Sequence, residues 1–388
     1  MERTFELEIV DELLDVLASK EIVQAAGVHR EPVDNYTSEA RFAAERDVLF
    51  GHTPQAVALS GELPEVGSFK TIDELGVPIV VVRGEDGVVR GFLNVCGHRG
   101  ARLVEDQRGT ARRLACPFHA WSYRPDGSLS GVPGQRAFPG LCRDERALRP
   151  VQTREHLGVV WVVVSDAAPM DLAAHLGPFA DELARWEVSN WHYLETRVHT
   201  VPANWKIVMD TFTEGYHVPV LHKDTIGAQA AGALTAYRAF GDHHRMIFPM
   251  KTLAELRDQP RERWRAFAEW RFAITYTLYP NTTFLVAGDH AEMFQTYPGR
   301  TVDSSICLHS LFTFNPIGEQ EREHYRTLFD FFYNLVATED FRISAGIERG
   351  LRTGAVTHHL YGANEPMTQA MHRAYTRDLA TSATGEQR

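Results

Sequence analysis

The order of apolar and polar residues divides the chain into helical and strand-like stretches. To about Asn35, apolar residues recur at the spacing of one helix face, which predicts a helical N-terminal segment; they are Leu7, Val10, Leu13, Leu14 and Leu17. After Trp270 a second β-rich stretch runs to Phe314, with "FAITYTLYPNTTFLVAG" and "SSICLHSLFTF" as its clearest strands. Helical periodicity returns over residues 318–351 and 365–379. The polar end "TSATGEQR" is expected to fray.

Between these parts, from about Leu49, short β-rich runs alternate with turns. "PIVVVRGEDGVVRGFLNVC" holds two runs joined at Asp86-Gly87, which predicts a hairpin. A further turn is expected at Pro125-Asp126-Gly127, and "LGVVWVVV" reads as a buried strand. The pattern predicts a small all-β domain over residues 45–166. "MDLAAHLGPFADELARW", which follows it, is periodic and helical.

Composition narrows the class of protein. The chain has 388 residues, 44% of them hydrophobic and 23% charged, so it holds enough apolar residues for more than one core. A net charge of −11 argues against nucleic acid as a partner. No apolar run approaches the ~20 residues of a membrane span, and the acidic start is unlike a signal peptide. Four cysteines in so long a chain do not make a disulfide scaffold. We therefore expect a cytoplasmic protein.

Two cysteine–histidine pairs carry the first candidate chemistry. Cys96 and His98 are followed, after seventeen residues, by Cys116 and His119. Two thiolates and two imidazoles suit either a tetrahedral zinc ion or a two-iron, two-sulfide cluster with histidines on one iron. Zinc modules group like ligands, whereas here each loop offers one of each kind. The spacing favours the cluster.

A second histidine pair lies in "NWKIVMDTFTEGYHVPVLH". His217 and His222 are five residues apart, which is not a helix-face spacing, and Pro219 is expected to end the helix between them. Two histidines and one carboxylate make the facial triad of non-haem Fe(II) oxygenases, which leaves positions open for O2 and substrate. The carboxylate is not local, and the C-terminal helical stretch offers three: Asp330, Glu339 and Asp340.

Together, "CGHRGARL…CPFHAWSY" and "NWK…EGYHVPVLH" resemble the catalytic α subunits of Rieske non-haem iron oxygenases. The resemblance spans nearly the whole chain. It implies an N-terminal helical segment (1–44), a Rieske [2Fe–2S] domain (45–166) and a catalytic mononuclear iron domain (167–388). The implied fold is α+β, with an all-β Rieske domain and an antiparallel catalytic sheet wrapped around long helices in a helix-grip arrangement. "ATEDFRISAGIERGL" resembles the ligand-bearing helix of the family, which selects Asp340, with Asp330 in reserve.

The resemblance also assigns roles around the histidines. Glu214 is expected one helical turn before His217 and on the same face. In the family an acidic residue at this position, more often Asp, connects an iron-binding histidine to a cluster-binding histidine of the neighbouring subunit in a trimer. The cluster-binding histidine corresponds to His119. Asp210 is expected to support this site from one turn earlier, and Asn204 to lie near the iron. All three are candidate catalytic residues.

The function implied is that of a terminal oxygenase component. Electrons would come from an NAD(P)H-dependent reductase, directly or through a ferredoxin, and O2 would hydroxylate a small, apolar, aromatic substrate. Oxidative N- or O-demethylation and quaternary-amine monooxygenation stay open, as does a Rieske electron carrier without oxygenase activity. A homotrimer is expected, with or without a β subunit, and no nucleic acid or membrane partner.

Further side chains are candidates for the substrate pocket. His290 and His309 fall in expected strands and are weaker candidates for its lining. Four aromatic residues of the catalytic sheet are candidates for an apolar wall: Phe272, Tyr276, Tyr279 and Phe284. The basic run Arg108–Arg113 fits a solvated loop or a docking patch for an acidic electron donor.

Overall fold

The computed structural model describes residues 2–167 and 169–384, which divide into two compact units. The smaller unit comprises Arg46–His175 and Glu187–Trp191. The larger unit comprises the chain up to Glu45, Leu176–Trp186 and the chain from His192 onward. The smaller unit thus reaches further than the expected 45–166: it continues to His175 and also includes the short stretch 187–191.

The smaller unit is built from antiparallel strands. Its main sheet has seven strands in the order β2-β11-β10-β5-β4-β3-β6. Their bounds are β2 Gln55–Leu59, β3 Ser68–Ile72, β4 Ile79–Arg83, β5 Val89–Leu93, β6 Arg108–Thr110, β10 Pro150–His156 and β11 Val159–Val163. A second sheet has the order β7-β8-β9, from β7 Leu114–Ala115, β8 Ser122–Tyr123 and β9 Leu129–Gly131.

The turn signals of this unit are confirmed. β4 and β5 pair across the Asp86-Gly87 turn, where Gly87 has a φ of 78° that favours glycine. β8 and β9 pair across Pro125-Asp126-Gly127. All five residues of β11 are buried, because both faces of this strand are covered.

The larger unit is organised on one antiparallel seven-stranded sheet of order β12-β18-β17-β16-β15-β14-β13. The strands are β12 His192–Val201, β13 Ala236–Phe240, β14 His243–Pro249, β15 Phe272–Leu278, β16 Thr282–Ala287, β17 His290–Pro298 and β18 Ser305–Thr313. A two-stranded sheet pairs β1 His29–Pro32 with β19 His358–Tyr361, far apart in sequence. The predicted strands after Trp270 are confirmed.

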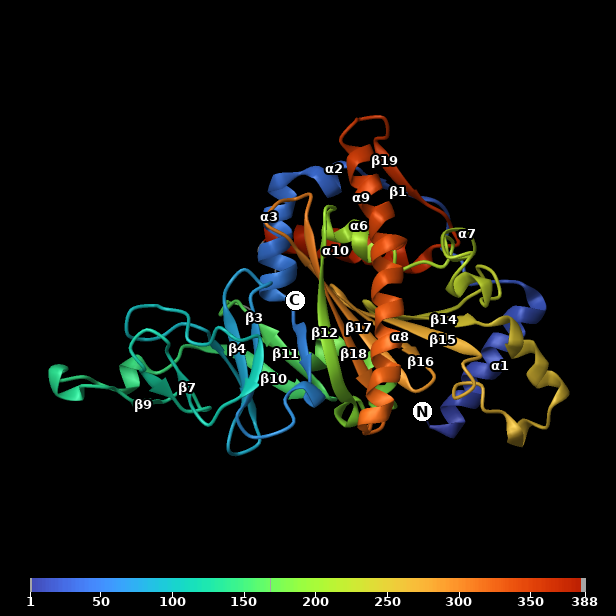
Figure 1. Cartoon of the computed structure of the whole chain (residues 1–388). Coiled ribbons are helices and arrows are strands. Elements are labelled where there is room, and N and C mark those ends of the chain that lie inside the picture. Colours follow the sequence, from blue (N-terminus) through green and yellow to red (C-terminus); the bar gives the residue numbers. More distant parts are fainter. Residues whose placement is uncertain (1, 168, 385–388) are drawn as a thin grey trace. The chain divides into compact units, whose positions relative to one another are not determined.

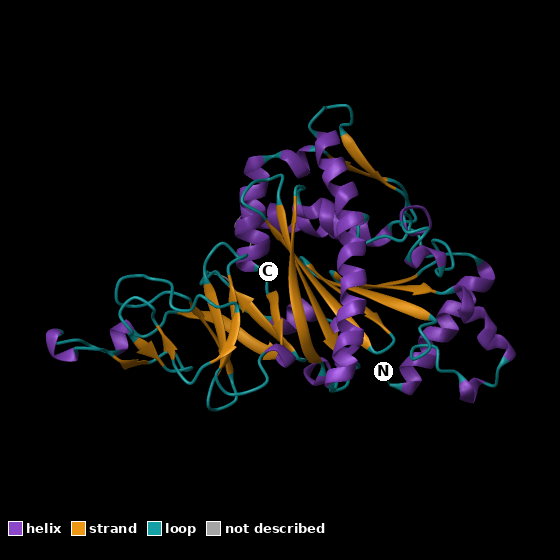
Figure 2. Cartoon of the chain, in the orientation of Figure 1, coloured by secondary structure: helices purple, strands orange, loops and turns teal. Residues whose placement is uncertain are grey.

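Long helices cover this sheet (Figures 1 and 2). Leu335 and Val336 of helix α8 and Phe341 of helix α9 share a buried cluster with Phe294 and Cys307 of the sheet. The helices are α1 Arg3–Ser19, α2 Asp34–Thr37, α3 Glu39–Asp47, α4 Leu172–Leu176, α5 Phe179–Ala184, α6 Trp205–Asp210, α7 Val218–Leu221, α8 Glu319–Thr338, α9 Asp340–Leu351 and α10 Pro366–Thr384. α1 packs against β13 and β14 with Phe5, Ile9, Val10, Leu13 and Leu14 buried.

Several helix boundaries differ from the predictions. The N-terminal helix ends at Ser19, where Lys20 adopts a left-handed conformation, so a helix to Asn35 is wrong. The stretch 318–351 is two helices, because the chain breaks at Glu339. Gly177 and Pro178 separate α4 from α5. The last helix continues to Thr384 instead of fraying at residue 381, and the final "GEQR" lies outside the described residues.

The α+β class with an all-β unit and a helix-covered antiparallel sheet is confirmed. No helix within residues 2–167 and 169–384 combines the length and the hydropathy that crossing a bilayer requires.

Candidate metal centres and their cavity

The two cysteine–histidine loops of the smaller unit have the same backbone pattern. Cys96 N donates to Ala101 O at 2.8 Å, and Gly100 N donates to Cys96 O at 3.0 Å. In the second loop Cys116 N donates to Trp121 O at 2.8 Å, and Ala120 N donates to Cys116 O at 2.9 Å. Gly100 and Ala120 both have a positive φ, of 77° and 56°. Each loop therefore holds its cysteine at the same place in a tight turn.

The four candidate ligands come together in two pairs of like kind. Cys96 and Cys116 are buried and share one core cluster. The rings of His98 and His119 lie 4.9 Å apart between centroids. His98 also stacks on Trp121, at 4.6 Å and with an interplanar angle of 6°, which fixes its ring. His119 is exposed, as is the neighbouring Phe118.

Tyr123 supports this site. Its hydroxyl lies 3.5 Å from Cys96 Sγ and accepts a hydrogen bond from Gly97 N at 2.9 Å. Trp121 and Tyr123 were not singled out from the sequence, although both stand in the motif "CPFHAWSY". Their place directly after the second loop is the signal that marks them.

The arrangement fits a two-iron cluster better than a single zinc ion. A zinc ion needs four ligand atoms around one point. Among the described residues, such a convergence of three ligand atoms within 4.8 Å of one another is found at His217, His222 and Asp340 in the larger unit. It is not found at the two cysteine–histidine loops, as far as the described residues go. Here sulfur lies with sulfur and imidazole with imidazole, as one iron with two cysteines and another with two histidines requires. Burial raises the pKa of the Cys96 thiol, so a bound cation is needed to hold it as thiolate.

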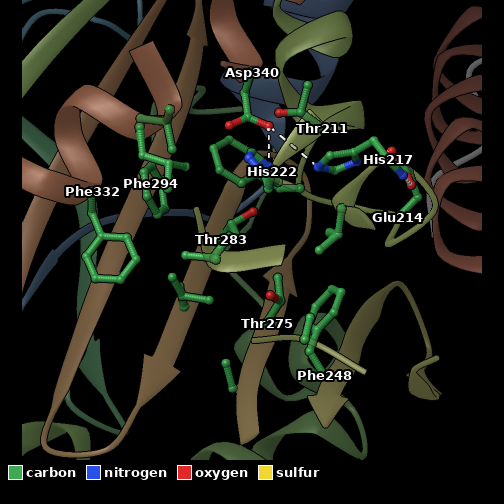
Figure 3. A pocket seen from close by; sticks show the side chains of 18 of the residues that line it. Thr211, Glu214, His217, His222, Phe248, Thr275, Thr283, Phe294, Phe332 and Asp340 are labelled. Atoms are coloured by element: carbon green, nitrogen blue, oxygen red, sulfur yellow. Dashed lines mark hydrogen bonds and ion pairs between the residues drawn. The ribbon is translucent and has the colours of Figure 1, made fainter. Parts of the chain in front are cut away.

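In the larger unit three predicted side chains converge on one point. His217 Nε2 lies 3.6 Å from Asp340 Oδ1, and His222 Nε2 lies 3.3 Å from the same oxygen (Figure 3). One ligand atom from each residue lies within 4.8 Å of the others. His222 and Asp340 are buried, and His217 is partly exposed. Two imidazoles and a carboxylate with space beside them fit a mononuclear Fe(II) site.

The local backbone explains the five-residue spacing of the histidines. Pro219 was expected to end a helix, and this is wrong: it lies in the first turn of the short helix α7, where its missing N–H costs nothing. His217 precedes this single turn and His222 follows it. The two rings therefore meet across the turn, with centroids 5.0 Å apart.

The structure also distinguishes the three candidate carboxylates. Asp340 begins α9 and points at both histidines. Glu339 contacts His222 at the ring nitrogen that faces away from Asp340, with Oε2 lying 2.5 Å from Nδ1. Asp330 is exposed and pairs with Arg197 at 2.5 Å. Burial by itself lowers the pKa of His222, and the carboxylates of Asp340 and Glu339 outweigh it and raise this pKa, so the site attracts a cation.

Glu214 reaches His217 through a turn, so the predicted helical face is wrong. Residues 211–217 are not helical. One carboxylate oxygen of Glu214 contacts His217 Nδ1, and the other accepts hydrogen bonds from the backbone N–H groups of Tyr216 and His217. The ring of His217 is thereby held with Nε2 toward Asp340.

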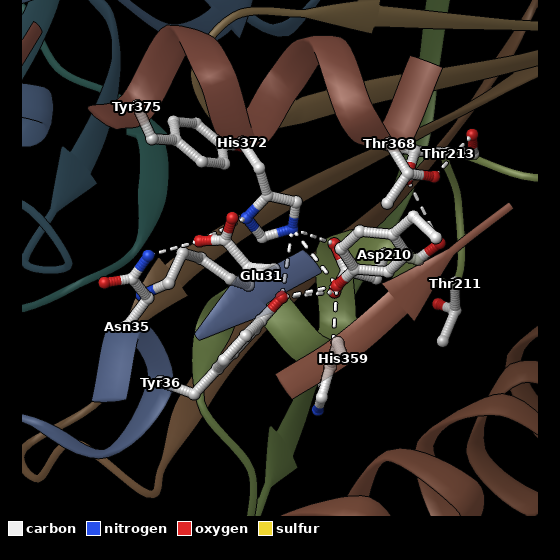
Figure 4. A network of polar contacts seen from close by, with 12 residues as sticks. Glu31, Asn35, Tyr36, Asp210, Thr211, Thr213, His359, Thr368, His372 and Tyr375 are labelled. Carbon is white, nitrogen blue, oxygen red and sulfur yellow. Dashed lines mark hydrogen bonds and ion pairs between the residues drawn. The ribbon is translucent and has the colours of Figure 1, made fainter. Parts of the chain in front are cut away.

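Asp210 lies in a different network (Figure 4). Its carboxylate is 2.8 Å from His372 Nε2 and accepts hydrogen bonds from Tyr361 at 2.7 Å and Tyr36 at 3.2 Å. His372 Nδ1 lies 3.5 Å from Glu31 Oε1. This buried cluster joins α6 to β1, α2, β19 and α10, and Asp210 contacts neither His217 nor His222 in it. These contacts hold Asp210 within this network, and its expected support of the iron site stays a prediction.

Asn204 is likewise occupied by the fold. Its side chain caps α6, accepting from Lys206 N at 3.0 Å and donating to Tyr36 O and Val302 O at 2.9 Å each. It does not line the cavity at the histidines. Its position sets the start of the helix that leads to Glu214, and no contact of Asn204 places it at the iron site.

A cavity of about 120 Å³ opens beside the triad (Figure 3). Glu214, His217, His222 and Asp340 line one end. Three threonines, Thr211, Thr275 and Thr283, are the other polar lining residues. The rest of the lining is apolar: Phe212, Val218, Ile226, Ala230, Phe248, Met250, Ala273, Leu285, Phe294, Phe332, Leu335 and Val336.

The four aromatic residues expected at this wall are not there. Along β15 the lining residues are Ala273 and Thr275, and along β16 they are Thr283 and Leu285. Phe272, Tyr276 and Phe284 alternate with these and face the other side of the sheet, because successive side chains of a strand point to opposite faces. Tyr279 is buried elsewhere, bonded to Asp378 at 2.9 Å. His290 and His309 also do not line the cavity, and both lie at Glu292.

Comparisons with known proteins agree with this geometry. Residues 183–381 match the family described as "Ring hydroxylating alpha subunit (catalytic domain)", which is more than half of the chain. Residues 53–153 match the Rieske [2Fe–2S] domain and include all four residues of the two loops. The family match thus covers the triad, and the domain match covers the cluster loops.

Curated relatives are oxygenase subunits. The chain is 33% identical over 204 residues to the anthranilate 1,2-dioxygenase large subunit of Burkholderia cepacia, covering 50% of this chain and 48% of that one. It is 32% identical over 205 residues to the glycine betaine monooxygenase oxygenase subunit of Chromohalobacter salexigens, covering 53% and 46%. The matched part is therefore about half the length of these relatives.

Solved structures share the fold over nearly the whole chain. The quaternary ammonium Rieske monooxygenase CntA in complex with L-carnitine aligns with a TM-score of 0.75 at 21% identity, over 94% of this chain and 98% of that one. Naphthalene 1,2-dioxygenase from Rhodococcus sp. aligns with a TM-score of 0.73 at 17% identity, over 97% and 98%. With the family matches, this similarity shows that the chain belongs to the ring-hydroxylating alpha subunits and carries a Rieske [2Fe–2S] domain ahead of the catalytic domain that binds mononuclear iron.

Proposed function

We propose that the chain is the terminal oxygenase component of a multicomponent system. It would receive electrons from an NAD(P)H-dependent reductase, directly or through a ferredoxin, and use O2 to oxidise a small organic molecule. The observation that carries this proposal is the convergence of His217, His222 and Asp340 at the end of an apolar cavity. An electron carrier has no need of such a site.

In this proposal His217 Nε2, His222 Nε2 and an oxygen of Asp340 hold the iron. When bound, the iron would supply the activation of O2 at positions that these three ligands leave open. The chain's own part is to fix the ligands and to exclude water. Glu339 orients His222 through Nδ1, and Glu214 orients His217 in the same way. The phenylalanine, leucine and valine side chains of the cavity keep the site dry.

Cys96, Cys116, His98 and His119 are proposed to hold the Rieske cluster. Tyr123, close to Cys96 Sγ, would donate a hydrogen bond to the thiolate and so favour the reduced cluster. Cys142, which is exposed, and Cys307, buried in the larger unit, have no part in it.

Electron transfer between the two sites is proposed to run from His119 to Glu214 and His217 of a neighbouring copy of the chain, in a homotrimer. Both ends of this link are accessible. His119 is exposed next to Phe118, which is 59% exposed. Glu214 and His217 stand beside Tyr216 and Val220, which are 66% and 74% exposed. Apolar side chains exposed beside both groups suit contact between copies. The trimer is proposed with or without a β subunit.

The proposed reaction is the oxidation of a substrate by O2, which the named relatives have in common. O2, a pair of electrons and a pair of protons either place one oxygen atom in the substrate and release water, or place both atoms in it. A named relative is a dioxygenase of anthranilate and another a monooxygenase of glycine betaine. Formaldehyde among the products would identify oxidative demethylation. A location in the cytoplasm, where NAD(P)H is available, belongs to the same proposal.

Metal analysis tests the proposal directly. The purified chain is expected to contain about three iron atoms, about two in the cluster and about one at the triad, and to show the brown colour of a Rieske centre. Asp340→Ala is expected to lose the mononuclear iron and keep the cluster spectrum, while Asp330→Ala, altered at an exposed position, keeps both. About two iron atoms in the unaltered chain would indicate an electron carrier. A colourless zinc protein would refute the cluster.

A further inference from the structure

The charge of the cavity lining limits what it can bind. Apart from the proposed iron ligands and Glu214, no described residue that lines the cavity is charged. A carboxylate brought into this apolar space would have neither Lys nor Arg to pair with, and burying an unpaired charge is strongly unfavourable. Apart from the proposed iron, the lining therefore offers an organic anion no cationic partner.

The aromatic residues of the cavity do not enclose a cation either. Phe294 packs against Phe212 with centroids 4.7 Å apart and against His309 at 4.0 Å. Phe332 and Phe248 lie at opposite sides of the cavity in Figure 3, with Thr283 and Thr275 between them. Quaternary ammonium ions are typically recognised by a cage of aromatic ring faces around them. The lining favours an uncharged molecule.

One polar atom of the cavity lining is fully buried and has no hydrogen-bond partner among the described residues. Thr283 is 1% exposed, and its Oγ1 forms no hydrogen bond with any described residue. It lines the cavity from β16, on the sheet face that carries Leu285 and Thr275 (Figure 3). Thr211, by contrast, donates to Val208 O at 2.8 Å. A buried hydroxyl without a partner is rare in folded proteins and calls for one from a ligand.

The size of the cavity agrees with a small ligand. Its volume of about 120 Å³ is close to the roughly 150 Å³ of an engineered apolar cavity that binds benzene. We propose that the cavity binds an uncharged, mainly apolar molecule of about one ring, whose single polar group forms a hydrogen bond with the Thr283 hydroxyl. Thr283 is then a substrate-binding residue, and this inference rests on the proposed function.

Binding to the iron-loaded protein tests the inference without turnover. Isothermal titration would compare four one-ring probes: toluene, benzyl alcohol, benzoate and benzyltrimethylammonium. Benzyl alcohol is expected to bind most tightly, toluene about tenfold more weakly, and the two ions not measurably. Tighter binding of either ion, or no binding of the two neutral probes, would overturn the proposed ligand class.

Three variants test the hydroxyl. Thr283→Val is expected to weaken benzyl alcohol binding about tenfold and to leave toluene binding unchanged. Thr283→Ser, which keeps the hydroxyl, should restore the affinity. Thr282→Val is the matched control, since Thr282 is buried in the same strand and faces away from the cavity. Equal losses for both probes in Thr283→Val would reduce Thr283 to a packing residue.

The iron content separates this inference from the proposed function. If the chain carries no mononuclear iron, the proposed function fails whatever binds. If the iron is present and the neutral probes do not bind, only the ligand class fails.

Discussion

His222 and Glu339 meet through His222 Nδ1 and Glu339 Oε2 at 2.5 Å, on the side of the ring opposite the nitrogen that faces Asp340. Thr225 donates to the same Glu339 oxygen at 3.1 Å. The break between α8 and α9 makes this possible, because it places two consecutive acids on either side of one imidazole. Asp340 is placed to bind the metal, and Glu339 is placed to orient the ring of His222.

Glu339→Gln is expected to weaken iron binding at the triad about 10- to 100-fold and to leave the Rieske spectrum unchanged. The carboxylate holds His222 with Nε2 free for metal, and loss of such a partner typically costs this much. Competition with a chelator, followed by iron analysis, measures the affinity. Asp330→Asn, which changes an exposed acid on α8, serves as the control. Unchanged affinity in Glu339→Gln would mean that Asp340 and the backbone suffice to fix the ring.

Glu214→Gln is expected to retain both metal sites and to slow reoxidation of the reduced cluster about 10- to 100-fold when substrate and O2 are added. Its amide still accepts from the backbone of Tyr216 and His217, so the turn persists, but the charge beside His217 Nδ1 is lost. Stopped-flow absorbance of the cluster gives the rate. Rapid oxidation in this variant would refute the role of Glu214 as the link.

The network around His372 predicts a dependence of stability on pH. Burial alone lowers the pKa of His372, but Asp210 and Glu31 outweigh it and raise the pKa to about 9. Burial raises the pKa of Tyr36 and of Tyr361 well above the ordinary value, so both stay neutral. Burial lowers the pKa of His359, which is also neutral at and above pH 7.

Because the folded state holds the proton on His372 more tightly than the unfolded chain, this contribution is complete below about pH 6.5 and disappears as the pH rises toward about 9. The free energy of unfolding should fall by about 1.4 kcal/mol per pH unit in this window. Urea titrations followed by circular dichroism measure it. His372→Gln should remove this part of the slope, and His358→Gln, at an exposed position, should not. Equal slopes for all three proteins would show that His372 is neutral in the fold.

Thr283→Val is expected to stabilise the ligand-free protein by about 1 kcal/mol, because it replaces a buried hydroxyl without a partner by a methyl group of the same size. Thr282→Val should have the opposite sign, since the Thr282 hydroxyl contacts Asn281 Oδ1 at 3.4 Å. Thermal unfolding midpoints of the two variants test the difference. A lower midpoint for Thr283→Val would show that the hydroxyl contributes to the fold itself.

Local sequence was sufficient to predict those features that are formed by residues close together in the chain. The spacing of Cys96, His98, Cys116 and His119 indicated a mixed cluster, because each loop is a short turn that presents its own two ligands. The Asp86-Gly87 hairpin and the buried strand of Val159–Val163 followed from turn residues and apolar runs in the same way. His217 and His222 stood out as a pair for the same reason, although Pro219 starts their helix instead of ending one.

The remaining decisions depended on contacts between distant segments. Spacing alone did not distinguish Asp330, Glu339 and Asp340, and only the family resemblance favoured Asp340. The break after Thr338 and the packing of α9 bring Asp340 to the histidines and leave Asp330 exposed. The predicted lining residues of β15 and β16 were wrong, because the residues next to them in each strand line the cavity. The alternation of side chains along a strand does not say which face of the sheet a helix will cover. The sequence by itself determined the family, the kind of cluster and the histidine pair. Tertiary packing alone decided the contact of Asp340 with both histidines, the residues that line the cavity and the unpaired hydroxyl of Thr283, because each is set by which distant side chains share one small volume.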